Sequence, residues 1–175
     1  NTGVECDNGV CIIGVGVRVE RLNFENFGGR GLIVSGQRTR LIHSFISSVS
    51  CYKNFIGFEF TEYGEYCTIS SIVASNNILG IKITAGNTFI SSGTFNDNRI
   101  GLYMNKAGND AHGCFSASQF NHSGIYSMVI DQITHGHSFV GCHVFEGDIY
   151  LINSIGFNFT GGTIDANIYA EGGKT

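Results

Sequence analysis

The sequence has no proline and no tryptophan, and only 14% of its 175 residues are charged. It contains no run of lysine and arginine and has a formal net charge of −4, so it lacks the clustered positive charge that binding to duplex nucleic acid requires. Its longest apolar runs, such as Cys11–Val17, are interrupted by glycine and too short to cross a bilayer. We therefore expect no nucleic-acid partner and no membrane insertion.

Motifs that mark a cofactor are also missing, since no phosphate-binding loop, nucleophile elbow or EF-hand loop occurs. We predict that the protein uses no cofactor. The six cysteines form no CxxC pair; Cys67, Cys114 and Cys142 are expected to be reduced core thiols, whereas Cys6 and Cys11 can bridge across a turn. No signal peptide is visible, and we expect the chain to be a piece of a longer protein.

What the sequence does have is a repeat. In Phe95–Met104 a large apolar residue is followed by a polar corner, an asparagine and a glycine-led alternating segment, and Phe24–Val34, Val73–Ile83, Phe120–Ile130 and Phe145–Leu151 follow the same order. The residues expected at the equivalent corner are Asn26, Asn54, Asn77, Asn98, Ser123, Asp148 and Asn167. They are separated by roughly 19 to 28 residues, a period typical of solenoids.

Each repeat holds about three short strands, because apolar residues recur every second position and glycine, asparagine, aspartate or serine interrupts them. On the first strand, residues such as Phe58, Ile81 and Leu102 are expected to face inward. The second strand is expected to bury Cys67, Ile69, Phe89, Cys114 and Phe139. The third is expected to bury Phe24, Val49, Ile72, Phe95, Phe120, Phe145 and Ile164.

This spacing excludes helices and favours stacked coils about 4.8 Å apart. We predict an all-β fold, a right-handed single-stranded parallel β-helix of about seven rungs over residues 9–170. Residues 1–8 form an irregular lead-in and residues 171–175 a tail.

The pattern of apolar residue, polar pair, asparagine and Gly-Ile strand resembles the pectate-lyase-like superfamily of parallel β-helices. The low charge and the corners rich in asparagine, serine and glycine are most similar to bacteriophage tailspikes and capsular depolymerases. That resemblance implies a homotrimer in the phage tail of a virion, which binds and can depolymerise a bacterial surface glycan. It is an analogy of fold. A non-enzymatic β-helical shaft or adhesin segment, and a secreted polysaccharide lyase, are the alternatives.

Substrate-binding residues are expected where outward side chains stack in columns. Glu59, Lys82 and Tyr103 are predicted to occupy consecutive rungs of the first strand, with Arg18 and Ile33 below and Asp131 above. Lysine can neutralise a sugar carboxylate and tyrosine can stack on a sugar ring or transfer a proton. The alternative interpretation is a solvated face on which the glutamate and lysine pair.

Two further residues in bends are also predicted to bind substrate. These are Arg38, in the long bend Gly36–Arg40, and His135. His135, His137 and His112 gather in neighbouring bends, but their spacing matches no zinc template, so no metal is predicted.

Candidate catalytic carboxylates are sought as pairs. Glycoside hydrolases need two carboxyl groups about 5–9.5 Å apart. Glu59 and Asp131 would lie three rungs, or roughly 14 Å, apart and are excluded as a pair. Glu59 with Glu62 or Glu65, and Glu146 with Asp165, remain candidates, although acidic residues are also ordinary turn formers.

Overall fold

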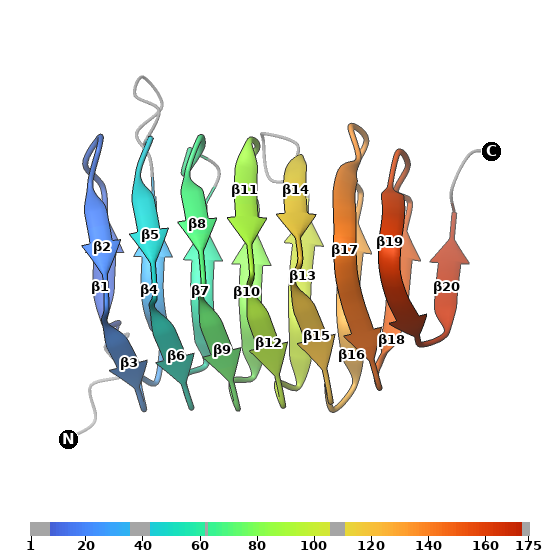
Figure 1. Ribbon diagram of the computed structural model, residues 1–175, viewed down its shortest axis with the longest axis horizontal. Helices are drawn as coiled ribbons and strands as arrows, with labels where there is room; N and C mark the ends of the chain where they lie inside the picture. The colour runs from blue at the N-terminus through green and yellow to red at the C-terminus, as the bar shows by residue number, and fades with distance from the viewer. Residues whose placement is uncertain (1–7, 36–42, 62, 106–110, 173–175) are drawn as a thin grey trace.

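The computed structural model describes residues 8–35, 43–61, 63–105 and 111–172. In this part of the chain there are twenty β-strands and no helix, and therefore none that could span a membrane. The strands pair in parallel and coil into a solenoid of about six turns, close to the seven rungs predicted from the sequence (Figure 1). The all-β parallel β-helix is confirmed.

Sheet A takes one strand from each coil. Its order is β1 (Val10–Ile12), β4 (Arg30–Val34), β7 (Ile56–Phe60), β10 (Leu79–Ile83), β13 (Ile100–Asn105), β16 (Tyr126–Asp131), β18 (Asp148–Ile152) and β20 (Ile168–Glu171). Every neighbour in this order is hydrogen-bonded in parallel, so each sheet A strand lies against the strand one coil earlier and one coil later.

Sheet B consists of two rows of strands. The first row is β2 (Arg18–Glu20), β5 (Phe45–Ser47), β8 (Thr68–Ser70), β11 (Thr88–Ser91) and β14 (Gly113–Ser116). The second row is β3 (Asn23–Glu25), β6 (Ser50–Tyr52), β9 (Val73–Ser75), β12 (Thr94–Asn96) and β15 (Gln119–Asn121). The long strand β17 (His137–Phe145) pairs with both β14 and β15 and so joins the rows, and β19 (Asn158–Asp165) lies on β17.

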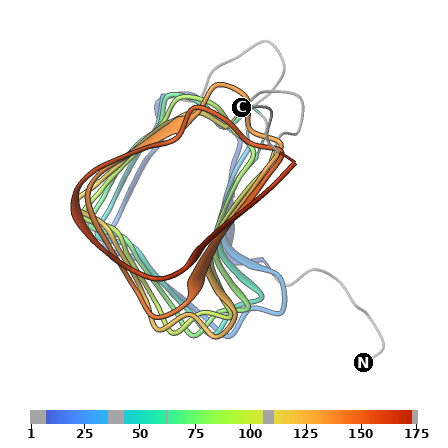
Figure 2. The same cartoon turned by 90° about the vertical axis from the view of Figure 1, so that its right-hand side faces the viewer.

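The coils superpose around one interior (Figure 2). Phe95 and Phe120, which the repeat predicts one above the other, are register partners, and their rings stack with centroids 4.9 Å apart. Phe115 packs edge-on against both rings and stacks on Phe139. The centre of the solenoid is thus an aromatic column that is shielded from water along its length.

The inward phase predicted for the second strand is wrong in two coils. Ile90 and Phe115 are buried, whereas Phe89 is 50% exposed and Cys114 is half-exposed on the outer face. Each of these strands has two adjacent apolar residues, so alternation alone fits either phase. Cys67 and Cys142 are buried free thiols, as expected, and burial raises their pKa.

The third-strand prediction is also wrong in part. The register partners in the second row are Phe24, Cys51, Ala74, Phe95, Phe120, Val144 and Ile164. Val49 and Ile72 are buried but precede their strands, and Phe145 and Ile164 are 42% and 38% exposed. In these coils the interior is filled both by a residue of the bend and by a residue of the strand that follows it. The repeat pattern in the sequence does not tell the two apart.

Candidate functional site

An asparagine ladder forms the corner between sheet B and sheet A. The Oδ1 atom of Asn77 accepts hydrogen bonds from the backbone N–H of Asn54 at 2.8 Å and from its Nδ2 at 3.2 Å. Asn98 accepts the same two bonds from Asn77, both at 3.0 Å. All three side chains are almost fully buried, so the ladder satisfies polar groups that would otherwise be costly inside the fold.

The first member expected for this ladder is displaced by one residue. Phe27, not Asn26, holds the position below Asn54, because the Phe27 N–H donates to Asn54 Oδ1 at 2.9 Å. Asn26 takes the preceding corner position, with a left-handed backbone. The ladder therefore runs through Asn54, Asn77 and Asn98 and makes the corner rigid.

Outside this ladder the corner is hollowed. One hollow is lined by Asn26, Phe27, Gly28, Lys53, Asn54, Phe55, Asn76 and Ile78. The next is lined by Asn76, Asn77, Asp97, Asn98, Arg99, His122, Gly124 and Ile125. A third, near the C-terminal end, is lined by Glu146, Gly147, Asp148, Ile164, Asp165, Ala166 and Asn167. We call these three hollows the corner groove.

The hollows follow one another along the same edge of the solenoid. Asn76 belongs to both the first and the second hollow. His122 of the second hollow and Glu146 of the third are within hydrogen-bond distance, with Nδ1 and Oε2 2.7 Å apart. From the first coil to the last, the corner groove spans six coil spacings, or about 30 Å.

One wall of the corner groove is a column of left-handed residues. Asn26, Lys53, Asn76, Asp97, His122 and Glu146 all have φ between 52° and 62°. Asparagine and aspartate adopt this conformation more readily than other residues with a Cβ, which explains why they recur in the column. The two asparagines and His122 can both donate and accept hydrogen bonds, Asp97 and Glu146 accept them when ionised, and Lys53 only donates.

The other wall is apolar and cationic. Phe55 and Ile78 are 55% and 45% exposed, and Arg99 follows them in the next coil. Aromatic rings also flank the first wall: Lys53 Nζ lies 4.7 Å from the centroid of the Tyr52 ring, and the Phe145 ring meets His122 edge-on. Apolar faces beside amides and charges are what a groove for a sugar chain needs.

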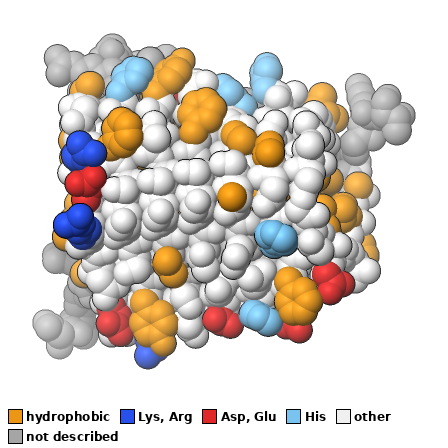
Figure 3. Space-filling model, viewed as in Figure 1, with side chains coloured by type: hydrophobic (Ala, Val, Ile, Leu, Met, Phe, Trp, Pro, Cys, Tyr) orange, Lys and Arg blue, Asp and Glu red, His pale blue; other side chains and the backbone are white. Residues whose placement is uncertain are grey.

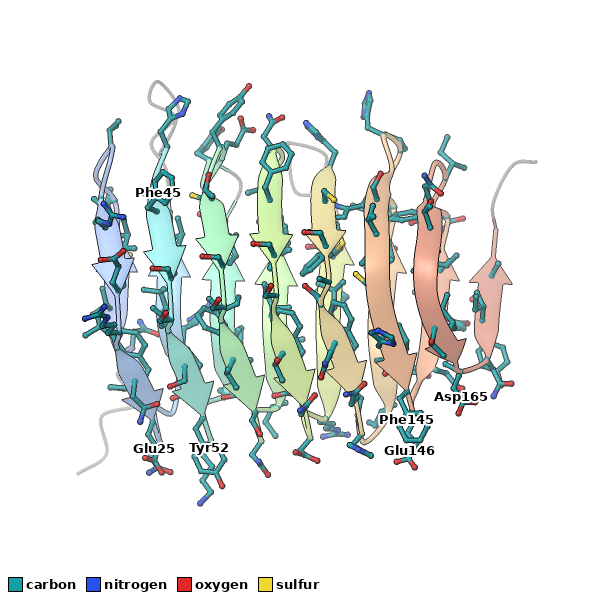
Figure 4. The ribbon with its side chains drawn as sticks, in the orientation of Figure 1. Glu25, Phe45, Tyr52, Phe145, Glu146 and Asp165 are labelled. Atoms are coloured by element: carbon teal, nitrogen blue, oxygen red, sulfur yellow. The ribbon has the colours of Figure 1, made fainter. Side chains whose placement is uncertain are left out.

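Carboxylates gather at the C-terminal end of the corner groove. Glu146 and Asp165, which form one of the predicted catalytic pairs, line a single hollow together with Asp148. Asp165 is the register partner of Phe145, the residue before Glu146. In Figure 4, Phe145, Glu146 and Asp165 project from the same edge of the solenoid as Glu25 and Tyr52 at the other end. Asp148 Oδ1 accepts hydrogen bonds from Asn167 N and Nδ2.

Glu59, of the other predicted pair, lies outside the corner groove. It is buried on β7, with Oε2 2.7 Å from Arg30 Nε and Oε1 2.9 Å from Lys82 Nζ. Burial by itself would raise the pKa of Glu59, but the hydrogen bonds and charges of Lys82 and Arg30 outweigh it and hold the pKa below its usual value of 4.5. A carboxylate stabilised in this way is a poor proton donor at neutral pH.

The column predicted on sheet A is confirmed from Ile33 to Tyr103. Ile33, Glu59, Lys82 and Tyr103 are successive register partners. Arg18 lies in sheet B, and Val129 rather than Asp131 is the partner of Tyr103. Asp131 pairs with Asn105, and its charge nevertheless adds to burial in raising the pKa of Tyr103.

The remaining predicted residues do not join this site. Arg38 and Glu62 lie outside the described residues. His135 is exposed in the bend after β16, with its ring 6.3 Å from that of His112. His137 is buried between Phe115 and Phe139, and burial lowers its pKa to about 3. No group of three or more histidine, cysteine, aspartate or glutamate residues suited to a metal occurs in the described part of the chain.

Sequence reasoning missed the groove residues Lys53, Phe55, Arg99 and His122. A signal for them exists, because each lies one residue before or one after a predicted corner position, which is Asn54, Asn98 or Ser123. Comparisons of the chain with family models, curated proteins and solved structures found no match.

Proposed function

We propose that this chain is a tailspike-type β-helix segment that binds an extended bacterial surface polysaccharide in the corner groove. The observation that supports the proposal is that hollows recur at the same corner in successive coils. A polymer with repeating sugars needs repeated, similar subsites along a straight line, and a solenoid supplies them at each coil. The walls offer amides, both signs of charge and exposed aromatic faces in the same line.

A binding experiment tests this proposal. Bacterial capsular and O-antigen polysaccharides are screened for binding to the wild-type protein by biolayer interferometry. Phe55→Ala removes an apolar face from the groove wall and is expected to weaken binding about tenfold. Ile155→Ala is the matched control, because Ile155 is 48% exposed but lies in the bend after β18. Equal affinities for the two variants would contradict the groove assignment and favour the alternative of a structural shaft.

The acidic end of the corner groove supports depolymerisation as a second proposed activity. Glu146 and Asp165 come from adjacent coils, which lie about 4.8 Å apart, and they line one hollow; this coil spacing is compatible with the carboxyl separation that glycoside hydrolases use. One carboxyl would protonate the departing glycosidic oxygen, and the other would attack the sugar or activate water. Glu146→Gln and Asp165→Asn are each expected to lower the release of reducing ends at least 100-fold. Unchanged release in both variants would rule out this pair.

The proposed assembly is a homotrimer on the virion. Its support is the fold, together with the half-buried apolar or aromatic residues Ile33, Tyr103 and Ile152 on the outer face of sheet A. Sedimentation at several protein concentrations measures the mass of the particle. A monodisperse monomer would contradict the trimer and the tailspike-type assignment.

A further inference from the structure

A second surface lies on the first row of sheet B. The outward side chains of β5, β8, β11 and β14 form two columns in register. One column is Phe45, Thr68, Phe89 and Cys114, and the other is Ser47, Ser70, Ser91 and Ser116. We call these eight residues the serine–phenylalanine face.

The serine–phenylalanine face has no charged side chain. All eight of its residues are uncharged, and all are exposed or half-exposed. Figure 3 looks onto this side of the molecule, and its acidic and basic side chains lie at the N-terminal edge and along the lower border rather than in the middle. At the N-terminal edge, Arg18 pairs with Glu20 at 2.9 Å.

Two phenyl rings stand out from this surface. Phe45 is 53% exposed and Phe89 is 50% exposed. Arg18 of the preceding coil lies with Cζ 5.7 Å from the Phe45 ring centroid and leaves that ring half open. Figure 4 shows Phe45 on β5, far from the edge that carries the corner groove. Covering such a ring would remove apolar area from water and so favour the binding of another molecule.

The spacing of the two rings matches the repeat of one class of ligand. Phe45 and Phe89 are both register partners of Thr68, so they are two strand spacings, or about 10 Å, apart. This length is close to that of one disaccharide unit in an extended β-linked glycan. Sugar rings pack their C–H face on an aromatic ring, and the adjacent column of four serine hydroxyls can donate to and accept from sugar hydroxyls.

We propose that the serine–phenylalanine face binds a linear, uncharged, β-linked polysaccharide, with every second sugar stacked on Phe45 or Phe89. A carboxylated sugar would bring a charge onto a surface whose neighbouring basic group, Arg18, is already paired with Glu20. This inference rests on the proposed glycan-binding function and adds to it a second surface and a class of ligand.

The test uses the spacing of the rings. The double variant Thr68→Phe/Phe89→Thr keeps two phenylalanines in the same column but places them in adjacent coils. The probes are five-sugar oligosaccharides of β-1,4-glucan, β-1,4-mannan, β-1,4-xylan and chitin, with polygalacturonate as the charged comparison, measured by isothermal titration calorimetry. At least one neutral probe is expected to bind, and the double variant and Phe89→Ala are each expected to weaken it about tenfold.

Phe55→Ala separates this inference from the groove assignment. If the neutral probe binds to the serine–phenylalanine face, its affinity is unchanged in Phe55→Ala. Loss of binding in Phe55→Ala with no change in Phe89→Ala would overturn the inference and leave the groove proposal standing. No binding of any neutral probe, tighter binding of polygalacturonate, or equal affinity in the double variant would also overturn it. So would a drop in sedimenting mass in Phe89→Ala, because the face would then be an interface between copies of the chain.

Discussion

The same corner of the solenoid is built differently in its middle coils and at its C-terminal end. In the middle coils, the buried amides of Asn54, Asn77 and Asn98 bond to one another and to backbone groups. Towards the C-terminus, Ser123 follows in the series, and within the described residues its Oγ has no hydrogen-bond partner. Beyond it, Asp148 bonds Asn167, which is exposed.

The buried amides of the middle coils stabilise the fold, whereas the exposed carboxylates at the C-terminal end are available to a ligand. Where the amide ladder is intact, its hydrogen bonds pair polar groups that are buried in the solenoid. The hollows outside this part of the ladder are lined mostly by uncharged residues. Where the ladder ends, Glu146, Asp148 and Asp165 line the hollow. A carboxylate is tolerated there because it reaches water. The comparison predicts that mutations cost stability in the middle coils and activity at the C-terminal end.

The largest effect on stability is expected for Asn77→Ala. This side chain accepts two hydrogen bonds from Asn54 and donates to Asn98 Oδ1 and Cys51 O, so its loss leaves several buried groups unpaired. We expect the free energy of unfolding to fall by about 3 kcal/mol. Asn167→Ala, at the exposed end of the corner, should lower it by less than about 1 kcal/mol. Urea titration measures the free energy of unfolding of both variants. Equal decreases would contradict the difference between the middle coils and the C-terminal end.

The next largest effect on stability is expected for a substitution of Gly80, with Gly124 as its comparison. A Cβ at Gly80 would lie 2.6 Å from Gly101 O and 2.8 Å from Asn98 Nδ2, so Gly80→Ala pushes the coils apart at the ladder and should cost about 2 kcal/mol. At Gly124, where the ladder has passed to serine, the nearest atom would be 3.7 Å away. Gly124→Ala should change stability by less than about 0.5 kcal/mol. The comparison fails if the midpoint of thermal unfolding shifts equally in both variants.

The smallest effect comes from the ion pairs. Glu59→Gln removes a buried carboxylate from between Arg30 and Lys82, both of which can turn to water, and should cost about 1 kcal/mol at pH 7. The exposed His122–Glu146 pair should contribute close to nothing, so His122→Gln is the matched control.

The pH dependence of stability identifies the Glu59 contribution. Because the folded protein lowers the pKa of Glu59, its stabilisation is complete above the ordinary value of 4.5 and is lost as the pH falls through the folded value. Wild type should therefore lose more stability than Glu59→Gln between pH 5 and the acid limit of folding. Parallel curves from urea titrations over this range would show that Glu59 contributes nothing.

Much of the fold was predictable because stacking imposes a repeat. The vertical alignment of Phe95 with Phe120 and the positions of Asn54, Asn77 and Asn98 follow from spacing alone. The pairing of Glu146 with Asp165 in one hollow was predicted for the same reason. Whether that pair catalyses a reaction stays a prediction.

The incorrect predictions for individual strand residues share one cause. Alternation of apolar residues indicates which side chains share a face of the strand, but it does not fix their register with the next coil. The alternation predicts Asp131 beside Tyr103, two residues from its observed register, because a shift of two keeps a side chain on the same face. The alternation also predicts Phe89 in the interior, because Phe89 and Ile90 are both apolar and either one fits the inward position.

The amino-acid sequence by itself determined a parallel β-helix, since its period, its corner asparagines and its alternating strands agree at every level. Only the tertiary structure decided which side chains meet outside the core. The corner groove and the serine–phenylalanine face each join residues from four or more coils, and a one-residue change in any bend moves a whole column. Register between coils depends on packing inside the solenoid, and no local segment of the sequence carries that information.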